Sequence, residues 1–213
     1  MKYGVIIDGL NTYTVLNMCL TSDLRIPAPA QKRTTVDIPG ADGDLDLSLA
    51  LNPYPVFKTR QLSWSLVCTG NQKEFYIAMH ELMKYHGKRV DVILPDDPVH
   101  HWTGILSVDP SRSWMAQTIQ MTLLAQPYAL KNQLTVKNIV IDGDTIELLN
   151  ELKPCVPSFR LITSAGVAHV NGHLIEPDIV NTFEDIILYP GSNVLSVDGT
   201  GVEIEVSYQE GTL

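Results

Sequence analysis

The chain has 213 residues, of which 45% are hydrophobic, and a mean hydropathy of +0.05, the composition of a globular protein with room for one large or two small cores. Its formal net charge is −9, and the acidic excess is concentrated in residues 131–213, which carry 4 Lys and Arg against 12 Asp and Glu, whereas residues 1–130 carry 11 against 12. This distribution argues against nucleic acid as a partner, because a phosphate backbone requires a basic face.

The sequence lacks signals for membranes, export and cofactors. No window approaches the run of about 18 apolar residues that a membrane helix requires, and residues 1–8 have neither the apolar region nor the cleavage site of a signal peptide. We therefore expect synthesis in the cytoplasm and no membrane partner. Cys19, Cys68 and Cys155 are far apart and lack metal or redox spacing, so we expect reduced packing residues and no cofactor.

The first distinctive element is a proline-rich segment over residues 21–51. Pro27, Pro29 and Pro39 each remove a backbone donor and hold the preceding residue extended, so neither a helix nor a central strand is expected. We predict an arm that does not fold on itself and that is either disordered or held by a neighbouring chain. The alternating leucines of residues 45–51 fit both a strand and, through i, i+4 spacing, a helical turn.

The charges of this arm form two groups on opposite sides of a short extended stretch. The basic group comprises Arg25, Lys32 and Arg33, and the acidic group comprises Asp42, Asp44 and Asp46. Residues 42–46 imitate the start of a calcium loop, but the glycine stands second instead of sixth and Pro53 occupies the position of the bidentate glutamate. Turn chemistry explains these residues without a metal.

The rest of the first half predicts strands around one helix. Alternating apolar residues indicate strands over residues 61–68 and 118–123, with further candidates at 89–94 and 102–108 and a turn at 95–98. A helix is expected between the strand candidates at residues 61–68 and 89–94. Its features are Asn71 as N-cap, Glu74 three residues on, Phe75, Met79, Leu82 and Met83 at helical spacing, and Gly87 as the C′ residue.

From about residue 131 the pattern becomes one of short strands between turns. Turn signals recur at Asp142-Gly143, Asn171-Gly172, Pro190-Gly191 and Asp198-Gly199. The clearest strand has Val202, Ile204, Val206 and Tyr208 facing inward. The pattern predicts a β-sandwich over residues 131–213, after an α+β domain over residues 1–130 in which one helix covers an antiparallel sheet.

The histidines do not predict a metal or catalytic site. If Asn171-Gly172 is a two-residue hairpin turn, His169 and His173 point to opposite faces of the ribbon. In His100-His101-Trp102, neighbouring residues of a strand diverge, no nucleophile elbow is present, and entry from a loop into a strand with a buried tryptophan is the better interpretation. His80 is expected on a solvated helix face. Catalytic, metal and cofactor-binding residues are therefore predicted to be absent, and an enzyme is the weaker class of explanation.

The order of these features resembles the distal tail proteins (Dit) of long-tailed bacteriophages over nearly the whole chain. The resemblance is carried by the start Tyr3-Gly4-Val5-Ile6-Ile7-Asp8-Gly9, the arm with Asp37-Ile38-Pro39-Gly40-Ala41-Asp42-Gly43, residues 86–97, and the ending from Tyr189-Pro190-Gly191-Ser192-Asn193 to Tyr208-Gln209-Glu210-Gly211.

The resemblance implies a non-enzymatic structural protein of the virion tail tip. Members of this family form hexameric rings from a tube-like N-terminal β domain, with one helix on a split-barrel-like antiparallel sheet, and a C-terminal galectin-like β-sandwich. The implied partners are further copies of the chain, the tail tube protein, the tail-associated adhesin or hub protein and, through the C-terminal domain, a receptor-binding protein. In several members an arm reaches the neighbouring subunit, a role that residues 25–51 match.

A ring closed by head-to-tail contacts needs two different, complementary surfaces on each subunit. The opposite charges of the arm are expected to supply them, steering register more than affinity. The predicted interface residues are Arg25, Lys32, Arg33, Asp37, Ile38, Asp42, Asp44 and Asp46.

Two other functions remain open on the sequence, a carbohydrate-recognising receptor-binding module and a tail-associated hydrolase. A sugar site usually needs an exposed aromatic platform, yet Trp64, Trp102 and Trp114 all lie in the first half. In the second half Phe159 and Tyr208 occupy inward positions and are expected in the core, which leaves only Phe183 and Tyr189. A hydrolase would need a converging set of acid, base or nucleophile residues, and the sequence shows none.

Overall fold

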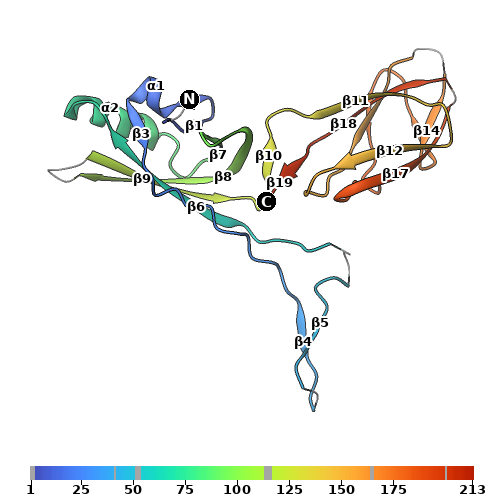
Figure 1. The fold of residues 1–213 in the computed structure, drawn as a ribbon, viewed down its shortest axis with the longest axis horizontal. Coiled ribbons are helices and arrows are strands. Elements are labelled where there is room, and N and C mark those ends of the chain that lie inside the picture. Colours follow the sequence, from blue (N-terminus) through green and yellow to red (C-terminus); the bar gives the residue numbers. More distant parts are fainter. Residues whose placement is uncertain (1–2, 41, 51–53, 113–116, 164–165, 200) are drawn as a thin grey trace. The chain divides into compact units, whose positions relative to one another are not determined.

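The computed structural model describes residues 3–40, 42–50, 54–112, 117–163, 166–199 and 201–213. The chain divides into two compact units, unit 1 (Met1–Pro127) and unit 2 (Tyr128–Leu213). Within the described ranges the protein is mainly β, with two helices among many short strands (Figure 1). This confirms the predicted fold class.

Unit 1 is built on a curled antiparallel sheet. Its strands, in order across the sheet, are β2 (Leu10–Asn11), β1 (Ile6–Ile7), β7 (Arg89–Leu94), β8 (Asp97–Arg112), β9 (Gln117–Ala125), β6 (Arg60–Cys68) and β3 (Met18–Leu20). The four predicted strands are confirmed, and their inward residues pack in the core. Trp64 of β6, for example, pairs with Met121 of β9, and both are fully buried. The turn after β7 is shorter than predicted, because Leu94 pairs with Asp97 and β8 already begins there.

The predicted helix is present as α2 (Gln72–Met83), which lies against β8 and β9. Its N-cap is Asn71, whose side-chain oxygen accepts hydrogen bonds from the backbone N–H groups of Lys73 and Glu74 at 2.9 and 3.1 Å. Phe75, Ala78 and Leu82 form the buried face.

Two details of the predicted helix were wrong. Met83 is 42% exposed, because Ala78 and not Met83 continues the buried stripe. Gly87 is not the C′ residue, because the helix already ends at its C-cap Lys84. Gly87 has a φ of 76° and donates instead to the carbonyl of Leu106. The structure also adds α1 (Thr12–Leu16), a short helix that the sequence analysis did not predict.

Unit 2 contains two four-stranded antiparallel sheets. One has the order β11 (Thr135–Val140), β18 (Glu203–Tyr208), β13 (Ser158–Leu161) and β16 (Val180–Thr182). The other has the order β12 (Thr145–Asn150), β17 (Gly191–Asp198), β14 (Ala168–Val170) and β15 (His173–Ile175). Two short strands, β10 (Ala129–Lys131) and β19 (Gly211–Thr212), pair near the ends of the unit's chain.

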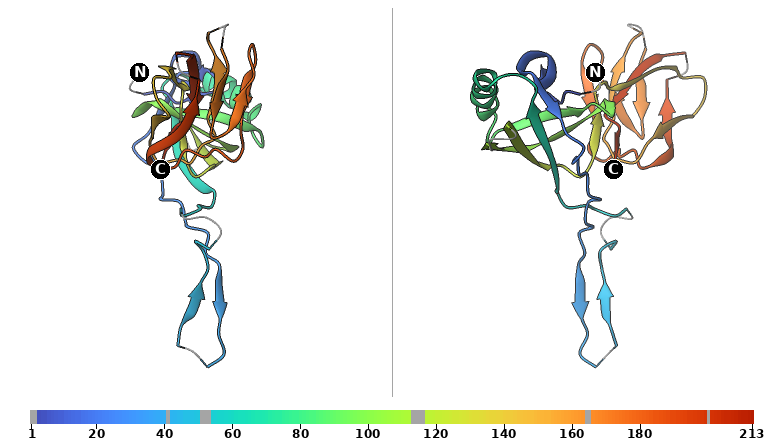
Figure 2. Two further views of the ribbon diagram at one scale, coloured as in Figure 1. Left: turned by 90° about the vertical axis from the view of Figure 1, so that its right-hand side faces the viewer. Right: turned by 60° about the vertical axis from the view of Figure 1, so that its left-hand side comes forward.

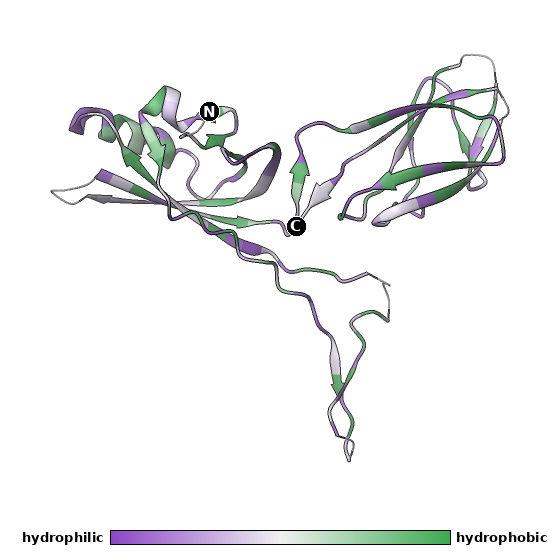
Figure 3. Cartoon of the chain, in the orientation of Figure 1, coloured by the Kyte–Doolittle hydropathy of each residue, from purple (hydrophilic) through white to green (hydrophobic). Residues whose placement is uncertain are grey.

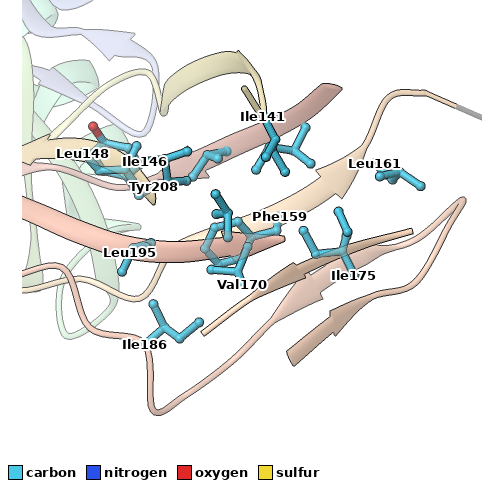
Figure 4. Packing of buried hydrophobic residues seen from close by; sticks show 14 of the residues in the cluster. Ile141, Ile146, Leu148, Phe159, Leu161, Val170, Ile175, Ile186, Leu195 and Tyr208 are labelled. Atoms are coloured by element: carbon cyan, nitrogen blue, oxygen red, sulfur yellow. The ribbon is translucent and has the colours of Figure 1, made fainter. Parts of the chain in front are cut away.

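Both sheets of unit 2 contribute to one hydrophobic core, the arrangement of a β-sandwich (Figure 4). Phe159 and Tyr208 come from the first sheet, and Leu148, Val170 and Leu195 from the second. The Tyr208 hydroxyl donates to the backbone carbonyl of Leu149 at 2.6 Å, so one side chain of the first sheet bonds the second. Phe159 and Tyr208 therefore occupy the core positions that the sequence predicted.

Candidate assembly surface

The arm between β3 and β6 is a long β-hairpin (Figures 1 and 2). Near its tip, β4 (Thr35–Asp37) pairs with β5 (Asp44–Asp46). Closer to the sheet, the Lys32 N–H donates to the Val56 carbonyl at 2.7 Å and the Lys58 N–H to the Ala30 carbonyl at 2.8 Å. The prediction that the arm cannot fold on itself was therefore wrong. Pro27, Pro29 and Pro39 all lie outside β4 and β5, so the ladder between these two strands needs no N–H from them.

The structure also decides the ambiguous leucine run. Leu45 lies in β5, whereas the chain turns after it, with the Ala50 N–H donating to the Leu47 carbonyl at 3.0 Å. Leu51 and Pro53 lie outside the described residues, as does Trp114. In the part of the chain that the structure describes, no three His, Cys, Asp or Glu side chains gather as metal ligands would.

The hairpin has one apolar and one acidic face. In the register of the two strands, Val36 pairs with Leu45, and side chains two residues apart share a face. The apolar face comprises Val36, Ile38, Leu45 and Leu47, which are 44, 42, 48 and 39% exposed; Figure 3 shows the hydropathy along the arm. Because a two-stranded ribbon is marginally stable alone and exposed apolar clusters mark contact sites, this face is suited to another protein surface.

The acidic face places like charges opposite each other. Asp37 of β4 pairs with Asp44 of β5, and Thr35 pairs with Asp46. Carboxylates directly opposite each other destabilise a ladder. Asp42 is exposed in the loop between the two strands. The acidic face therefore opposes the hairpin's own pairing unless a cation lies beside it.

The basic residues of the arm do not form the separate end that we predicted. Hydrogen bonds from Ser48 lower the pKa of Asp46, and the nearby charge of Arg33 adds to this effect. Folding back therefore brings Arg33 close to Asp46 within one chain. Arg25 lies at the arm's base, where its backbone pairs with that of Ser63, and Lys32 is exposed between the base and the tip.

The base of the arm is fastened by a buried arginine that the sequence analysis missed. Arg60, the first residue of β6, is 6% exposed, and its Nη1 donates to the carbonyl of Pro27 at 3.1 Å. Burial lowers the pKa of Arg60. The alternation of β6 carried a signal for this position, since Arg60 shares the inward face of Leu62, Trp64 and Leu66.

A second exposed apolar feature lies on α2, on the side away from its buried face. Tyr76 and Ile77 are 38 and 52% exposed. With Gln72, Lys73 and His80 they line an open groove with a volume of about 470 Å³. His80 is exposed, as predicted for a solvated helix face.

The two hairpin histidines of unit 2, His169 and His173, are placed as their strand positions predicted. His169 pairs with Leu174 and Val170 with His173, so the two imidazoles lie on opposite faces of the hairpin. The ring of His173 stacks on Phe183 with centroids 4.6 Å apart, and its Nε2 lies 2.7 Å from Asp185 Oδ2. His100 lies within β8, which begins earlier than the expected loop entry, and Trp102 is buried as predicted.

These features define a class of protein, a two-unit β protein in which a helix-covered sheet carries a projecting hairpin and a β-sandwich follows. The same fold is found in the SPP1 Dit (gp 19.1) protein, described as a paradigm of the hub adsorption apparatus in phages that infect Gram-positive bacteria. The match covers 99% of both chains with a TM-score of 0.69 and 12% sequence identity. It confirms the resemblance to distal tail proteins at the level of the fold.

The sequence itself matches no family model, and no curated protein matches it. Neither of the two helices in the described ranges is long and apolar enough to cross a membrane.

Proposed function

We propose that this chain is a structural protein of a phage tail tip, part of the apparatus through which the tail adsorbs to its host. The observation that carries this proposal is the fold match to the SPP1 Dit protein over 99% of both chains. The role is non-enzymatic, and the location is the tip of the virion tail.

The chain acts as one subunit of a hexameric ring in which the arm reaches the neighbouring copy. The paired part of the hairpin runs from Gln31 to the loop after Ile38. At about 3.3 Å per residue, such a strand spans roughly 25 to 30 Å, close to the diameter of a compact unit of this size. The arm is thus long enough to lie across a neighbour, and its apolar face requires such a cover.

The interface includes the eight arm residues identified in the sequence, with unequal roles. Ile38 belongs to the apolar face and contributes contact area. The charged residues of the set are Arg25, Lys32, Arg33, Asp37, Asp42, Asp44 and Asp46. They set orientation and register, since exposed charges contribute more to specificity than to affinity.

The ring joins the tail tube protein to the tail-associated adhesin or hub protein. In this proposal residues 1–130 form the ring, with the arm over about residues 21–51, and residues 131–213 form a galectin-like mount for a receptor-binding protein. A carbohydrate-recognising module is the weaker alternative. All five aromatic residues of unit 2 (Tyr128, Phe159, Phe183, Tyr189 and Tyr208) are buried or half-buried, whereas a sugar site needs an exposed platform.

Light scattering and negative-stain microscopy of the purified chain test this proposal. We expect a species of about 142 kDa, six times the 23.6 kDa chain, with a central channel. A chain that remains monomeric up to millimolar concentration would contradict the ring. Affinity of that monomer for host cell-wall sugar would support the carbohydrate-recognising module instead.

A further inference from the structure

An open pocket lies at the base of the arm, where the hairpin joins the sheet of unit 1. Its volume is about 510 Å³. Clefts of about 300 to 1,000 Å³ commonly hold small ligands, so this one has room for side chains of a short turn. The residues that line this base pocket are Lys32, Phe57, Lys58, Thr59, Gln126 and Pro127.

The base pocket is basic. Its charged lining residues are two exposed lysines, Lys32 and Lys58. The pairing of the arm brings them together, since the Lys32 N–H donates to the Val56 carbonyl and the Lys58 N–H to the Ala30 carbonyl. This register makes the two lysines diagonal neighbours on one face, about 7 to 8 Å apart. In the described ranges neither lysine forms an ion pair with an acidic side chain.

The tip of the hairpin carries the opposite charge. Asp37 and Asp44 pair across the strands on the acidic face, and Asp42 is exposed in the loop between them. Among the described residues no cation forms an ion pair with these three carboxylates, whereas Asp46 has the charge of Arg33 nearby. A cation from outside the hairpin would relieve the repulsion at the tip.

The tip does not reach the base pocket of its own chain. Asp37 follows Lys32 along an extended strand, which separates the two by roughly 15 Å. Figures 1 and 2 show β4 and β5 leading away from the sheet of unit 1. A contact between tip and pocket therefore joins different copies. Because each copy has one tip and one base pocket, the contact is heterologous, the kind that closes a ring.

The two faces of the ribbon have different roles in such a contact. The acidic face meets the lysines, so Val36 and Leu45 on the opposite face point away from the base pocket. The apolar face remains available for other contacts in the ring. Charge alone then directs the tip to the pocket, and complementary charge selects a partner and fixes its orientation.

We propose that the base pocket of each copy receives the acidic tip of the arm from the neighbouring copy. The two lysines of the pocket pair with the carboxylates of that tip. This inference rests on the proposed ring and names the surface that the tip of the arm occupies in it.

Mixing two charge-reversed variants of the full-length chain tests the contact. The pocket variant carries Lys32→Glu and Lys58→Glu, and the tip variant carries Asp42→Lys and Asp44→Lys. In either variant alone, like charges meet at every contact. The concentration needed for assembly, measured by light scattering, should therefore rise at least about tenfold.

An equal mixture of the two variants should recover assembly. In a ring where they alternate, the basic tip of one variant meets the acidic pocket of the other. The acidic tip of the pocket variant in turn meets the unchanged lysines of the tip variant. Opposite charges thus meet at every contact, and the concentration needed for assembly should return close to that of the wild type.

Unit 2 offers a matched control for the tip variant. Its loop residues Asp142-Gly143-Asp144 repeat the sequence Asp42-Gly43-Asp44, and both of its aspartates are exposed. A control variant with Asp142→Lys and Asp144→Lys should assemble as the wild type does and should not rescue the pocket variant. All the substituted residues are exposed, so each variant should keep the melting temperature of the wild type.

The outcomes distinguish this inference from the proposed function. Pocket and tip variants that each assemble like the wild type overturn the docking and leave the ring intact. Weakened assembly of both variants without recovery in the mixture shows that the two sites do not meet, and also overturns the docking. A wild-type chain that never assembles overturns both proposals. Recovery in the mixture, absent with the control variant, supports the contact.

Discussion

The guanidinium of Arg60 lies over the indole ring of Trp102, with its Cζ 4.1 Å from the ring centroid. Nη1 of the same group donates to the Pro27 carbonyl. The buried Nε and Nη2 have no hydrogen-bond partner among the described residues. The aromatic face is therefore the main compensation for a charge taken out of water. This contact connects β6 and β8 of the sheet with the segment that becomes the arm.

Replacing Arg60 tests whether this stacked contact stabilises unit 1. Arg60→Ala removes the stacking and the bond to Pro27, and we expect a loss of about 2 kcal/mol in the free energy of unfolding. Urea denaturation followed by tryptophan fluorescence measures it. Arg60→Met is the matched control, which keeps the aliphatic packing without unpaired donors and should lose less. Equal stability of wild type and Arg60→Ala would show that the contact contributes nothing.

Asp44→Asn should stabilise the arm. The substitution removes the repulsion between Asp44 and Asp37 across the strands, which we expect to contribute about 0.5 kcal/mol. Hydrogen exchange at the Leu47 N–H, which donates to the Thr34 carbonyl at 2.8 Å, reports on the hairpin. Slower exchange than in the wild type is the expected result. Asp42→Asn, in the loop, is the control, and a similar slowing there would refute the specific role of the Asp37–Asp44 pair.

The basic residues of the arm are expected to affect assembly through charge. The double substitution Lys32→Glu and Arg33→Glu should weaken the ring at low salt. Most of this effect should disappear at high salt, because salt screens the electrostatic interactions between exposed charges. Light scattering at both salt concentrations measures the mass. A ring of unchanged mass under both conditions would remove the charge argument.

Unit 2 should lose stability in acid through Glu210. This residue is 6% exposed, and its carboxylate accepts hydrogen bonds from Lys131 and Thr135. Burial alone would raise the pKa of Glu210, but these bonds and the charge of Lys131 outweigh it and hold the pKa below its ordinary value. A carboxyl group whose pKa is lowered by folding stabilises the fold at pH values above its ordinary pKa. This contribution is lost as the pH falls through the pKa of the group in the folded protein.

Lys131 gives the opposite sign at the alkaline end. Hydrogen bonds to Glu151 and Glu210 raise the pKa of Lys131, so its contribution is present below the ordinary lysine value and is lost as the pH rises through the folded value. The melting temperature of unit 2, measured as a function of pH, should therefore fall at both the acid and the alkaline extremes. Glu210→Gln should cost about 2 kcal/mol at neutral pH and flatten the acid limb. An acid limb identical to that of the wild type would exclude Glu210 as its source.

Local patterns were sufficient for the four long strands β6 to β9 of unit 1, for β18 of unit 2 and for one helix. The alternation at Leu62, Trp64 and Leu66 and at Ile204 and Val206 predicted inward side chains correctly, because successive residues of a strand face opposite sides wherever the strand lies. Asn71 marked the start of α2 for the same kind of reason, since a capping bond involves only residues two and three positions away.

The faces of the candidate assembly surface could not be predicted from local patterns. The sequence identified the arm and its charges, but the faces of the hairpin follow from the register of Val36 with Leu45, and that register depends on the loop between them. The sequence also led us to assign Arg33 and Asp46 to separate charged groups of the arm, whereas the folded hairpin brings these two residues close together.

The sequence by itself determined the mainly β class, the change of pattern near residue 131 and the existence of an arm, because each follows from local side-chain periodicity and turn chemistry. Only the tertiary structure decided that the arm pairs with itself, that Arg60 is buried over Trp102, and that Ile77 remains exposed while Ala78 is buried. These features depend on which distant segments meet, and the periodicity of one segment carries no information about its neighbour.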